Sequence, residues 1–283
     1  MGYISKRLAT RLNGDKRALQ RLRSEIGKIH ARTDWVPDPV HSAYVCAQNI
    51  TSLFAEGVSP LPELKPYYEA AGTAEEEYMP QGPPFSPLTA SYFTPWAFFD
   101  LRFGRDLETI GTILLDVSEQ VGLSPASFAA VRQFQQSRMG LYEYCGISQG
   151  RHCLRELITG DEFACVVPAG YPGQPGQLWY VRLCPPIQGY DYHVVFNTPY
   201  VMVRTSKADW TAYLERAING LAGDDTRTKL FRLLKFGRHT NGWNEFVFQA
   251  YMGHQSDAIF LAGLPDVPDS LPHGDMTGKR RCG

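Results

Sequence analysis

Residues 137–168 read SRMGLYEYCGISQGRHCLRELITGDEFACVVP, and this stretch decides the fold. Short apolar and aromatic runs alternate in it with turn residues. The runs suit a pleated, half-buried surface. Thr159, Gly160 and Asp161 lie between two such runs and are typical of a hairpin, because glycine takes a positive φ at no steric cost. We therefore expect consecutive strands here.

Two further runs, QLWYVRLCPP (177–186) and YHVVFNTPYVMV (192–203), follow a loop rich in proline and glycine. Five or six short strands with no helix between them are expected to pair antiparallel. They are too few for a sandwich, and a small closed barrel removes the edges that an open sheet would expose. The pattern predicts a small antiparallel, SH3- or OB-like β-barrel unit over residues 137–203.

Helical periodicity dominates on both sides of this unit. Two amphipathic helices with a break at residues 13–15 are expected at the start, and residues 58–87, which are rich in Pro, Gly and acid, predict a long ordered loop with a short helix. The fold class is thus α+β, with a helical region over 1–136 and C-terminal helices with a Pro-rich tail over 204–283. Further helices are expected at 41–56, 107–121, 125–135, 206–218 and about 225–237.

Four segments together resemble a family of uncharacterised bacterial proteins. They are FTPWAFFDLRFGRDLETI (93–110), SRMGLYEY (137–144), LRELITGDEF (154–163) and GQLWYVRLCPP (176–186). Members of that family have a Trp-to-Asp helical segment followed by a small β-domain, and some carry a Cys-rich zinc-binding SEC-C tail. This chain ends in MTGKRRCG without a Cys-x-Cys pair, so the zinc tail does not carry over. The resemblance implies a fold and assigns no activity.

Composition places the chain in the ordinary globular class. It has 283 residues, 43% of them hydrophobic and 20% charged, and its net charge is −1. That charge gives no global attraction to nucleic acid or to anionic membrane, so such binding would have to come from local patches. The chain has no run of eighteen apolar residues and its start lacks the apolar segment of a signal peptide. We expect a cytoplasmic protein.

The six cysteines are expected to be reduced and structural. None forms the Cys-x-x-Cys spacing that brings two thiolates to one zinc ion, and no secretion signal favours disulfides. Cys153 and Cys165 stand where small core residues belong. No metal and no cofactor is predicted.

The start of the chain is strongly basic. Residues 1–33 carry nine Lys or Arg against two acids, on the polar faces of the two expected helices. Such a face can be a solvated outer surface, a contact to a phosphate backbone, or a contact to a membrane or an acidic partner. Arginine predominates, which favours phosphate or carboxylate. The candidate nucleic-acid or partner-binding residues are Lys6, Arg7, Arg11, Lys16, Arg17, Arg21, Arg23 and Lys28, with Arg227, Arg232 and Lys235 from a second basic helix.

One polar stretch, residues 239–257, could carry chemistry near aromatic side chains. Its candidates are Glu245, His254 and Asp257, in a pocket lined by Trp243 and with Asp100 as a further acid. General acid–base catalysis would need these groups within hydrogen-bond reach, which spacing alone does not establish. The sequence lacks the zinc-hydrolase, nucleophile-elbow, Walker and Rossmann motifs. Capping and core roles explain the same residues.

These observations favour a non-catalytic interaction protein over an enzyme. In this hypothesis the β unit is a recognition scaffold and the basic helices contact nucleic acid or an acidic protein. A hydrolase-like enzyme with a pocket near Glu245 and His254 is the alternative, and a subunit of a larger assembly is a third reading. The ligand, the oligomeric state and whether the two basic helices share a face stay open.

Overall fold

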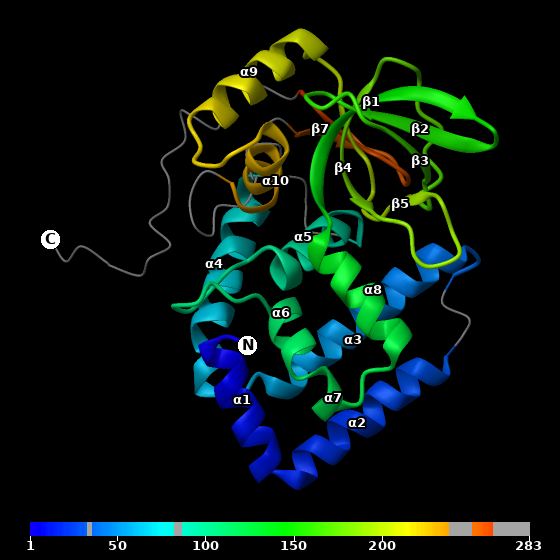
Figure 1. Cartoon of the computed structure of the whole chain (residues 1–283). Coiled ribbons are helices and arrows are strands. Elements are labelled where there is room, and N and C mark those ends of the chain that lie inside the picture. The colour runs from blue at the N-terminus through cyan, green and yellow to red at the C-terminus, as the bar shows by residue number, and fades with distance from the viewer. Residues whose placement is uncertain (33–35, 82–86, 238–250, 263–283) are drawn as a thin grey trace, which may run out of the picture.

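A computed structural model describes residues 1–32, 36–81, 87–237 and 251–262 of the chain. Helices α1 to α8 form one part of the molecule, and the β-barrel lies against it (Figure 1). Helices α9 and α10 lie beside the barrel, at the upper left of the view. The expected α+β class, with helices around a small barrel-like unit, is confirmed.

Five strands close the barrel. Each is hydrogen-bonded to the next in the order β1, β2, β3, β5, β4, and β4 returns to β1, so that the ring has no free edge. The remaining strands extend the sheet from β4 in the order β6, β8, β7. The bounds are β1 Arg138–Ser148, β2 Arg151–Glu156, β3 Glu162–Val166, β4 Leu178–Cys184, β5 His193–Val195, β6 Tyr200–Met202, β7 Tyr251–His254 and β8 Ile259–Leu261.

The sheet differs from the wholly antiparallel unit that we expected. β3 pairs in parallel with β5, and β6 pairs in parallel with β8. In each of these two pairs, other elements lie between the two strands in the sequence. They provide the crossover connection that parallel pairing requires. The second pairing brings the 251–262 segment back to the barrel after α9 and α10, so the sheet continues beyond residue 203.

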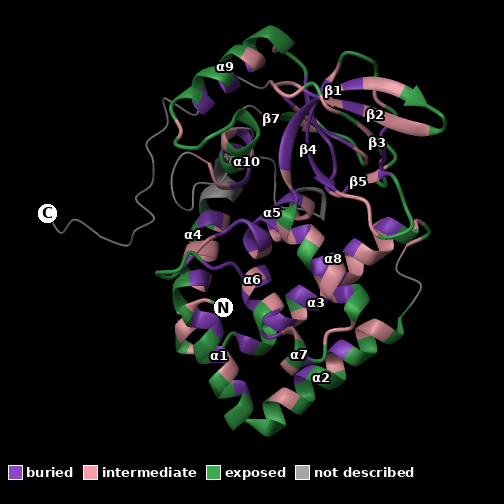
Figure 2. Cartoon of the chain, in the orientation of Figure 1, coloured by how far each residue is buried: buried purple, intermediate pink, exposed green. Residues whose placement is uncertain are grey.

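Strand β4 shows why these residues form a strand between two cores. Its seven residues are all buried, and all of them except Arg182 alternate between two apolar clusters. Trp179, Val181 and Leu183 fill the barrel, whereas Leu178 and Tyr180 face the core shared with the helices. Because successive side chains of a strand point to opposite faces, β4 contributes to a core on each side. Figure 2 shows β4 as buried along its length.

The helices begin at the capping residues that the sequence contains. The side chain of Asp15 accepts from the Ala18 N–H at the start of α2, and Ser124 and Ser206 cap α8 and α9 in the same way. The bounds are α1 Tyr3–Gly14, α2 Lys16–Ala31, α3 Pro39–Val58, α4 Lys65–Gln81, α5 Pro87–Phe99, α6 Ile110–Asp116, α7 Ser118–Val121, α8 Pro125–Gln136, α9 Lys207–Asn219 and α10 Thr226–Phe236, with a 3-10 turn, η1, at Pro62–Leu64.

Two expectations about the helical region are corrected. Residues 65–81 form the 17-residue helix α4, which is longer than the short helix expected within this loop, because Tyr67 and Ala74 provide a buried face despite the Pro-rich surroundings. The helix expected over 107–121 divides into α6 and α7 at Val117. None of the described helices is long and apolar enough to cross a membrane.

The start of α1 is held by a buried acid from another part of the chain. Glu108 lies before α6 and is 6% exposed. Its carboxylate accepts from the backbone N–H groups of Ile4 and Ser5, both at 2.9 Å, and from the Ser5 hydroxyl at 2.6 Å. Gly2, at the N-cap, has no side chain that could do this. A carboxylate at this end also complements the helix dipole.

Candidate functional site

The basic residues of α1 are largely paired within the molecule. Arg7 Nε lies 2.8 Å from Glu63 Oε1, and Arg11 Nη2 lies 3.3 Å from the same atom. Hydrogen bonding to Glu63 raises the pKa of Arg7, and the arginines lower the pKa of Glu63 against the effect of its desolvation. One acid of the predicted acidic segment, Glu63, therefore pairs with the first basic helix. Lys6 remains exposed on the same helix.

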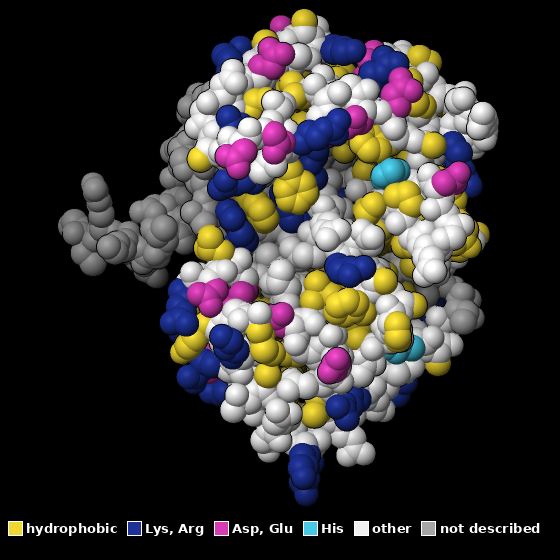
Figure 3. All heavy atoms as spheres, viewed as in Figure 1, with side chains coloured by type: hydrophobic (Ala, Val, Ile, Leu, Met, Phe, Trp, Pro, Cys, Tyr) yellow, Lys and Arg dark blue, Asp and Glu magenta, His cyan; other side chains and the backbone are white. Residues whose placement is uncertain are grey.

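The outer face of α2 is exposed and cationic. Arg23 donates to the Gln120 carbonyl at 2.5 Å, which ties it to α7. Lys16, Arg17, Arg21 and Lys28 are all exposed. Figure 3 shows Lys and Arg side chains along the lower edge of the molecule, where Figure 1 places α1 and α2. Within the described residues, Lys16, Arg17 and Arg21 make no ion pair, so this face offers cationic groups to a ligand.

The second basic helix, α10, is used differently. Arg227 pairs with Asp161, and Arg232 Nη1 donates to the Ala222 carbonyl at 3.0 Å. Lys235 is only 3% exposed, so its ammonium group does not reach a ligand at the surface, and its inclusion among the binding residues is corrected. α10 packs on α9 and β1, whereas α1 and α2 lie at the opposite end of the view in Figure 1.

Lys235 belongs to a buried ion cluster with Asp100 and Arg182. Lys235 Nζ lies 2.6 Å from Asp100 Oδ1, and Arg182 donates to the other carboxylate oxygen. The Ser137 carbonyl accepts from Lys235 at 2.7 Å and from Arg182 at 3.2 Å. The cluster joins the end of α5, the start of β1, β4 and α10. All three ionic side chains are at most 2% exposed.

The cluster contains two cations and one anion. Burial lowers the pKa of Lys235, Asp100 opposes this shift and Arg182 adds to it, and the resulting pKa is about 8. Asp100 was the further acid of the proposed hydrolase pocket. Its two oxygens are occupied by Lys235 and Arg182, so it holds the chain together and offers no open face to a substrate.

The polar stretch near the C-terminus is described only in part. Trp243 and Glu245 lie outside the described residues. His254 is exposed on β7, where its Nδ1 lies 2.6 Å from the Tyr251 hydroxyl, and Asp257 lies in the turn between β7 and β8. Within the described residues, this hairpin holds no hydrogen bond or ion pair between His254 and Asp257. The described part thus supplies no acid–base pair.

The cysteines differ in burial more than the sequence indicated. The five in the described segments are free thiols. Cys165 is fully buried in the barrel, as expected, and burial raises its pKa to about 12. Cys153 was expected to be a core residue, but it is half-buried on the outer face of the barrel, together with Cys145.

Sequence reasoning missed the ion cluster, although two signals mark it. Arg182 interrupts the apolar run LWYVRLC, and Lys235 interrupts LFRLLKF. A charge inside a buried run demands a partner. The partner, Asp100, is 82 positions from one cation and 135 from the other, so only the tertiary fold identifies it.

No family model, no curated protein and no solved structure matches this chain. The family resemblance drawn from the four sequence segments therefore stays a prediction.

Proposed function

We propose that this chain is a cytoplasmic interaction protein that binds a polyanion, and nucleic-acid phosphate in particular, through the outer face of α2. The observation that carries the proposal is one row of side chains, Arg17, Arg21, Ser24 and Lys28, which we name the α2 stripe. All four are exposed. We propose no catalytic role for the chain.

The spacing of the stripe makes it a single straight surface. Its members follow one another at intervals of four, three and four residues, which keeps them on one side of an α-helix. Leu22 and Ile26 are buried on the opposite side and fix the orientation of α2. At 1.5 Å per residue the stripe is about 16 Å long, which is enough to follow several phosphates of one strand.

The two arginines of the stripe support phosphate as the ligand. Across the described residues, neither Arg17 nor Arg21 takes part in an ion pair. Lys28 pairs with Glu25 at 2.5 Å, but both side chains are well exposed, and such pairs exchange readily for another anion. A guanidinium group binds two phosphate oxygens at once. The stripe is therefore a set of available cations.

The test is fluorescence anisotropy of the full chain with short mixed-sequence RNA and DNA over a range of salt concentrations. Wild type is expected to bind with an affinity that falls steeply with salt. A triple variant, Arg17→Gln, Arg21→Gln and Lys28→Gln, removes three phosphate contacts. Its plot of log affinity against log salt is expected to be less steep by about two to three, since each contact contributes about 0.7–0.9.

A control variant with the same net charge as the triple variant distinguishes a local contact from the effect of the protein's overall charge. Lys65→Gln, Arg204→Gln and Lys229→Gln remove three cations from other elements and are expected to leave binding nearly unchanged. Equal loss in the two triple variants, or no binding by wild type, would contradict the proposal. Binding of an acidic protein but of neither nucleic acid would shift the ligand class to that partner.

A further inference from the structure

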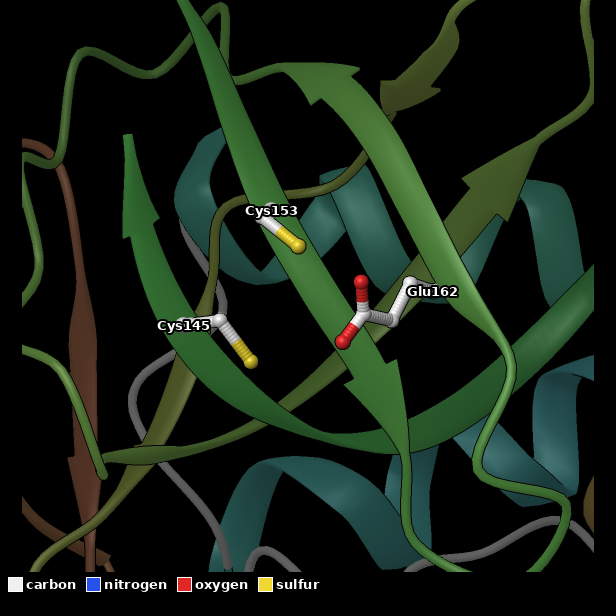
Figure 4. A group of neighbouring side chains, drawn as sticks. All are labelled: Cys145, Cys153 and Glu162. Atoms are coloured by element: carbon white, nitrogen blue, oxygen red, sulfur yellow. The ribbon is translucent and has the colours of Figure 1, made fainter. Parts of the chain in front are cut away.

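Three side chains that can bind metal meet on the outer face of the barrel. They are Cys145 of β1, Cys153 of β2 and Glu162 of β3, which come from three adjacent strands. One sulfur or oxygen atom from each lies within 4.8 Å of the other two. Figure 4 shows both sulfurs and the carboxylate directed into one space in front of the strands.

A β-bulge lies at the two cysteines. In the β1–β2 ladder Tyr144 opposes Leu154 and Gly146 opposes Cys153, so Cys145 is an extra residue between them. Gly146 has a φ of 101°, which a residue with a side chain rarely adopts. Cys145 follows Tyr144 along the strand, so its side chain lies on the solvent side of the sheet, beside Cys153. Tyr144 and Leu154 point the other way, into the barrel.

The carboxylate is oriented by a neighbour. Arg155 donates from Nε and Nη2 to the same oxygen of Glu162, Oε1, at 3.0 and 2.6 Å. In the described part of the chain no hydrogen bond reaches Oε2. One carboxylate oxygen is thus held by Arg155, and the other remains for a cation. A carboxylate so anchored by an outer residue is common around protein metal ions.

We infer that Cys145, Cys153 and Glu162 form a binding site for a thiophilic divalent cation of the zinc class. Tetrahedral zinc with bonds of about 2.3 Å to sulfur places two ligand sulfurs about 3.8 Å apart, which small side-chain rotations can reach from the present arrangement. Three protein ligands leave a fourth position, which faces solvent on this side of the barrel. That position would take water or a group from a binding partner.

The charges favour a divalent ion at this position. Two thiolates and one carboxylate carry −3, and a divalent cation with Arg155 carries +3. The neighbouring Glu143 also pairs with Arg155, at 3.6 Å, but its closer partner is Lys207, whose Nζ lies 2.6 Å from it and compensates its charge. A disulfide between the two cysteines would give Glu162 no role. The third ligand is therefore the feature that distinguishes a metal site from a redox pair.

The sequence contains a signal for this pair that a search for Cys-x-x-Cys does not find. Cys145 and Cys153 are equally distant from Gln149, at the tip of the β1–β2 hairpin, so the hairpin folds one toward the other. Glu162 follows on the next strand, with its Cα opposite Arg155. A hairpin thus brings two cysteines together that are farther apart in the sequence than those of a Cys-x-x-Cys motif.

The test uses Co²⁺ as a spectroscopic probe on the full-length, freshly reduced chain under anaerobic conditions. Wild type is expected to develop a thiolate-to-cobalt charge-transfer band that saturates at one ion per chain and disappears when Zn²⁺ is added. Cys145→Ser and Cys153→Ser are each expected to lose most of the band. Cys46→Ser, which changes a cysteine of α3, is expected to leave it intact.

Glu162→Gln tests the third ligand. It is expected to weaken Co²⁺ binding by at least about tenfold, the lower end of the loss seen when even outer-shell partners are removed. Glu143→Gln removes the same charge beside the site without removing a ligand, and it should have a much smaller effect. Circular dichroism confirms that each variant is folded.

Three results would overturn the inference. The first is a band that survives in both single-cysteine variants, which would place the metal elsewhere. The second is equal affinity of Glu162→Gln and wild type, which would reduce the site to a thiol pair. The third is absence of the band, with peptide mapping that finds a Cys145–Cys153 disulfide instead.

Discussion

Lys235 and Asp100 are 135 residues apart in the sequence, and their side chains meet at 2.6 Å with each residue only 3% exposed. Their contact fastens α10 to the end of α5 across the start of β1. Arg182 shares the same carboxylate, so one acid compensates two cations. Loss of the Lys235 proton would leave Asp100 and Arg182 as a balanced pair. The surroundings of Lys235 therefore favour the neutral form of its amine more than those of a lysine at the surface do.

This preference predicts a pH dependence of stability. The pKa of Lys235 is lowered from its ordinary value of 10.5 to about 8 in the folded chain. Between these values the unfolded chain binds more protons, so the contribution of Lys235 to the free energy of unfolding rises with pH; below about pH 8 it is constant. The gain is on the order of 3 kcal/mol at most by pH 11.

Urea denaturation of wild type and Lys235→Met at several pH values provides the measurement. Methionine keeps the length of the side chain and cannot be protonated. The free energy of unfolding of wild type minus that of the variant is expected to increase from pH 7.5 to pH 10. A constant or decreasing difference would show that the amine does not titrate in this range.

Removing the shared acid should be more damaging than removing a surface acid. Asp100→Asn leaves Arg182 and Lys235 buried without a counter-charge, and it is expected to lower the free energy of unfolding by about 3–5 kcal/mol. Glu69→Gln breaks the exposed pair with Lys65, which is 3.5 Å long, and should change little. Chemical denaturation of both variants checks the contrast; similar small losses would mean that solvent reaches the cluster.

Local sequence signals were sufficient for most elements. The break at Asp15, the cap at Ser124 and the strand runs of 137–203 each depend on neighbours in the chain, and the structure places helices or strands there. The same holds for the closure of the barrel, because short strands must hide their edges. For the break, the cap and the strand runs, the interacting residues lie within a few positions of one another in the sequence.

The parts that were missed depend on partners distant in sequence. β8 pairs with β6 after two intervening helices, and nothing local marks Ile259 as the partner of Tyr200. The carboxylate of Glu162 comes from a third strand, so only the register of three strands brings it beside Cys145 and Cys153. For the same reason the sequence predicted α10 as a binding helix, although Lys235 faces a buried acid.

The carboxylate of Glu108 substitutes for a missing cap, and this predicts a loss of stability. Glu108→Gln keeps the shape but replaces one acceptor oxygen with a donor that faces the N–H group of Ile4 or of Ser5. The free energy of unfolding is expected to fall by about 1–3 kcal/mol. Glu119→Gln, an exposed change in α7, is the control, and a loss no larger than that of the control would contradict the capping role.

Two glycines of one loop allow steric crowding to be separated from backbone strain. Gly173 and Gly176 both have positive φ, 66° and 89°. A Cβ on Gly173 would lie 2.4 Å from the Trp179 ring and 2.9 Å from the Tyr144 ring, whereas a Cβ on Gly176 would meet nothing within 4 Å. These two rings are stacked, with centroids 4.6 Å apart, in the barrel core.

Gly173→Ala is therefore expected to be the more destabilising of the two substitutions. Gly176→Ala carries only the cost of an alanine at positive φ, about 1–2 kcal/mol. Gly173→Ala carries that cost and must also displace the stacked rings, which adds about 1–3 kcal/mol of overpacking. Thermal denaturation followed by near-ultraviolet circular dichroism reports both the stability and the packing of Trp179. Equal losses in the two variants, with an unchanged aromatic spectrum, would mean that the rings can move aside and that Gly173 is needed only for its backbone angle.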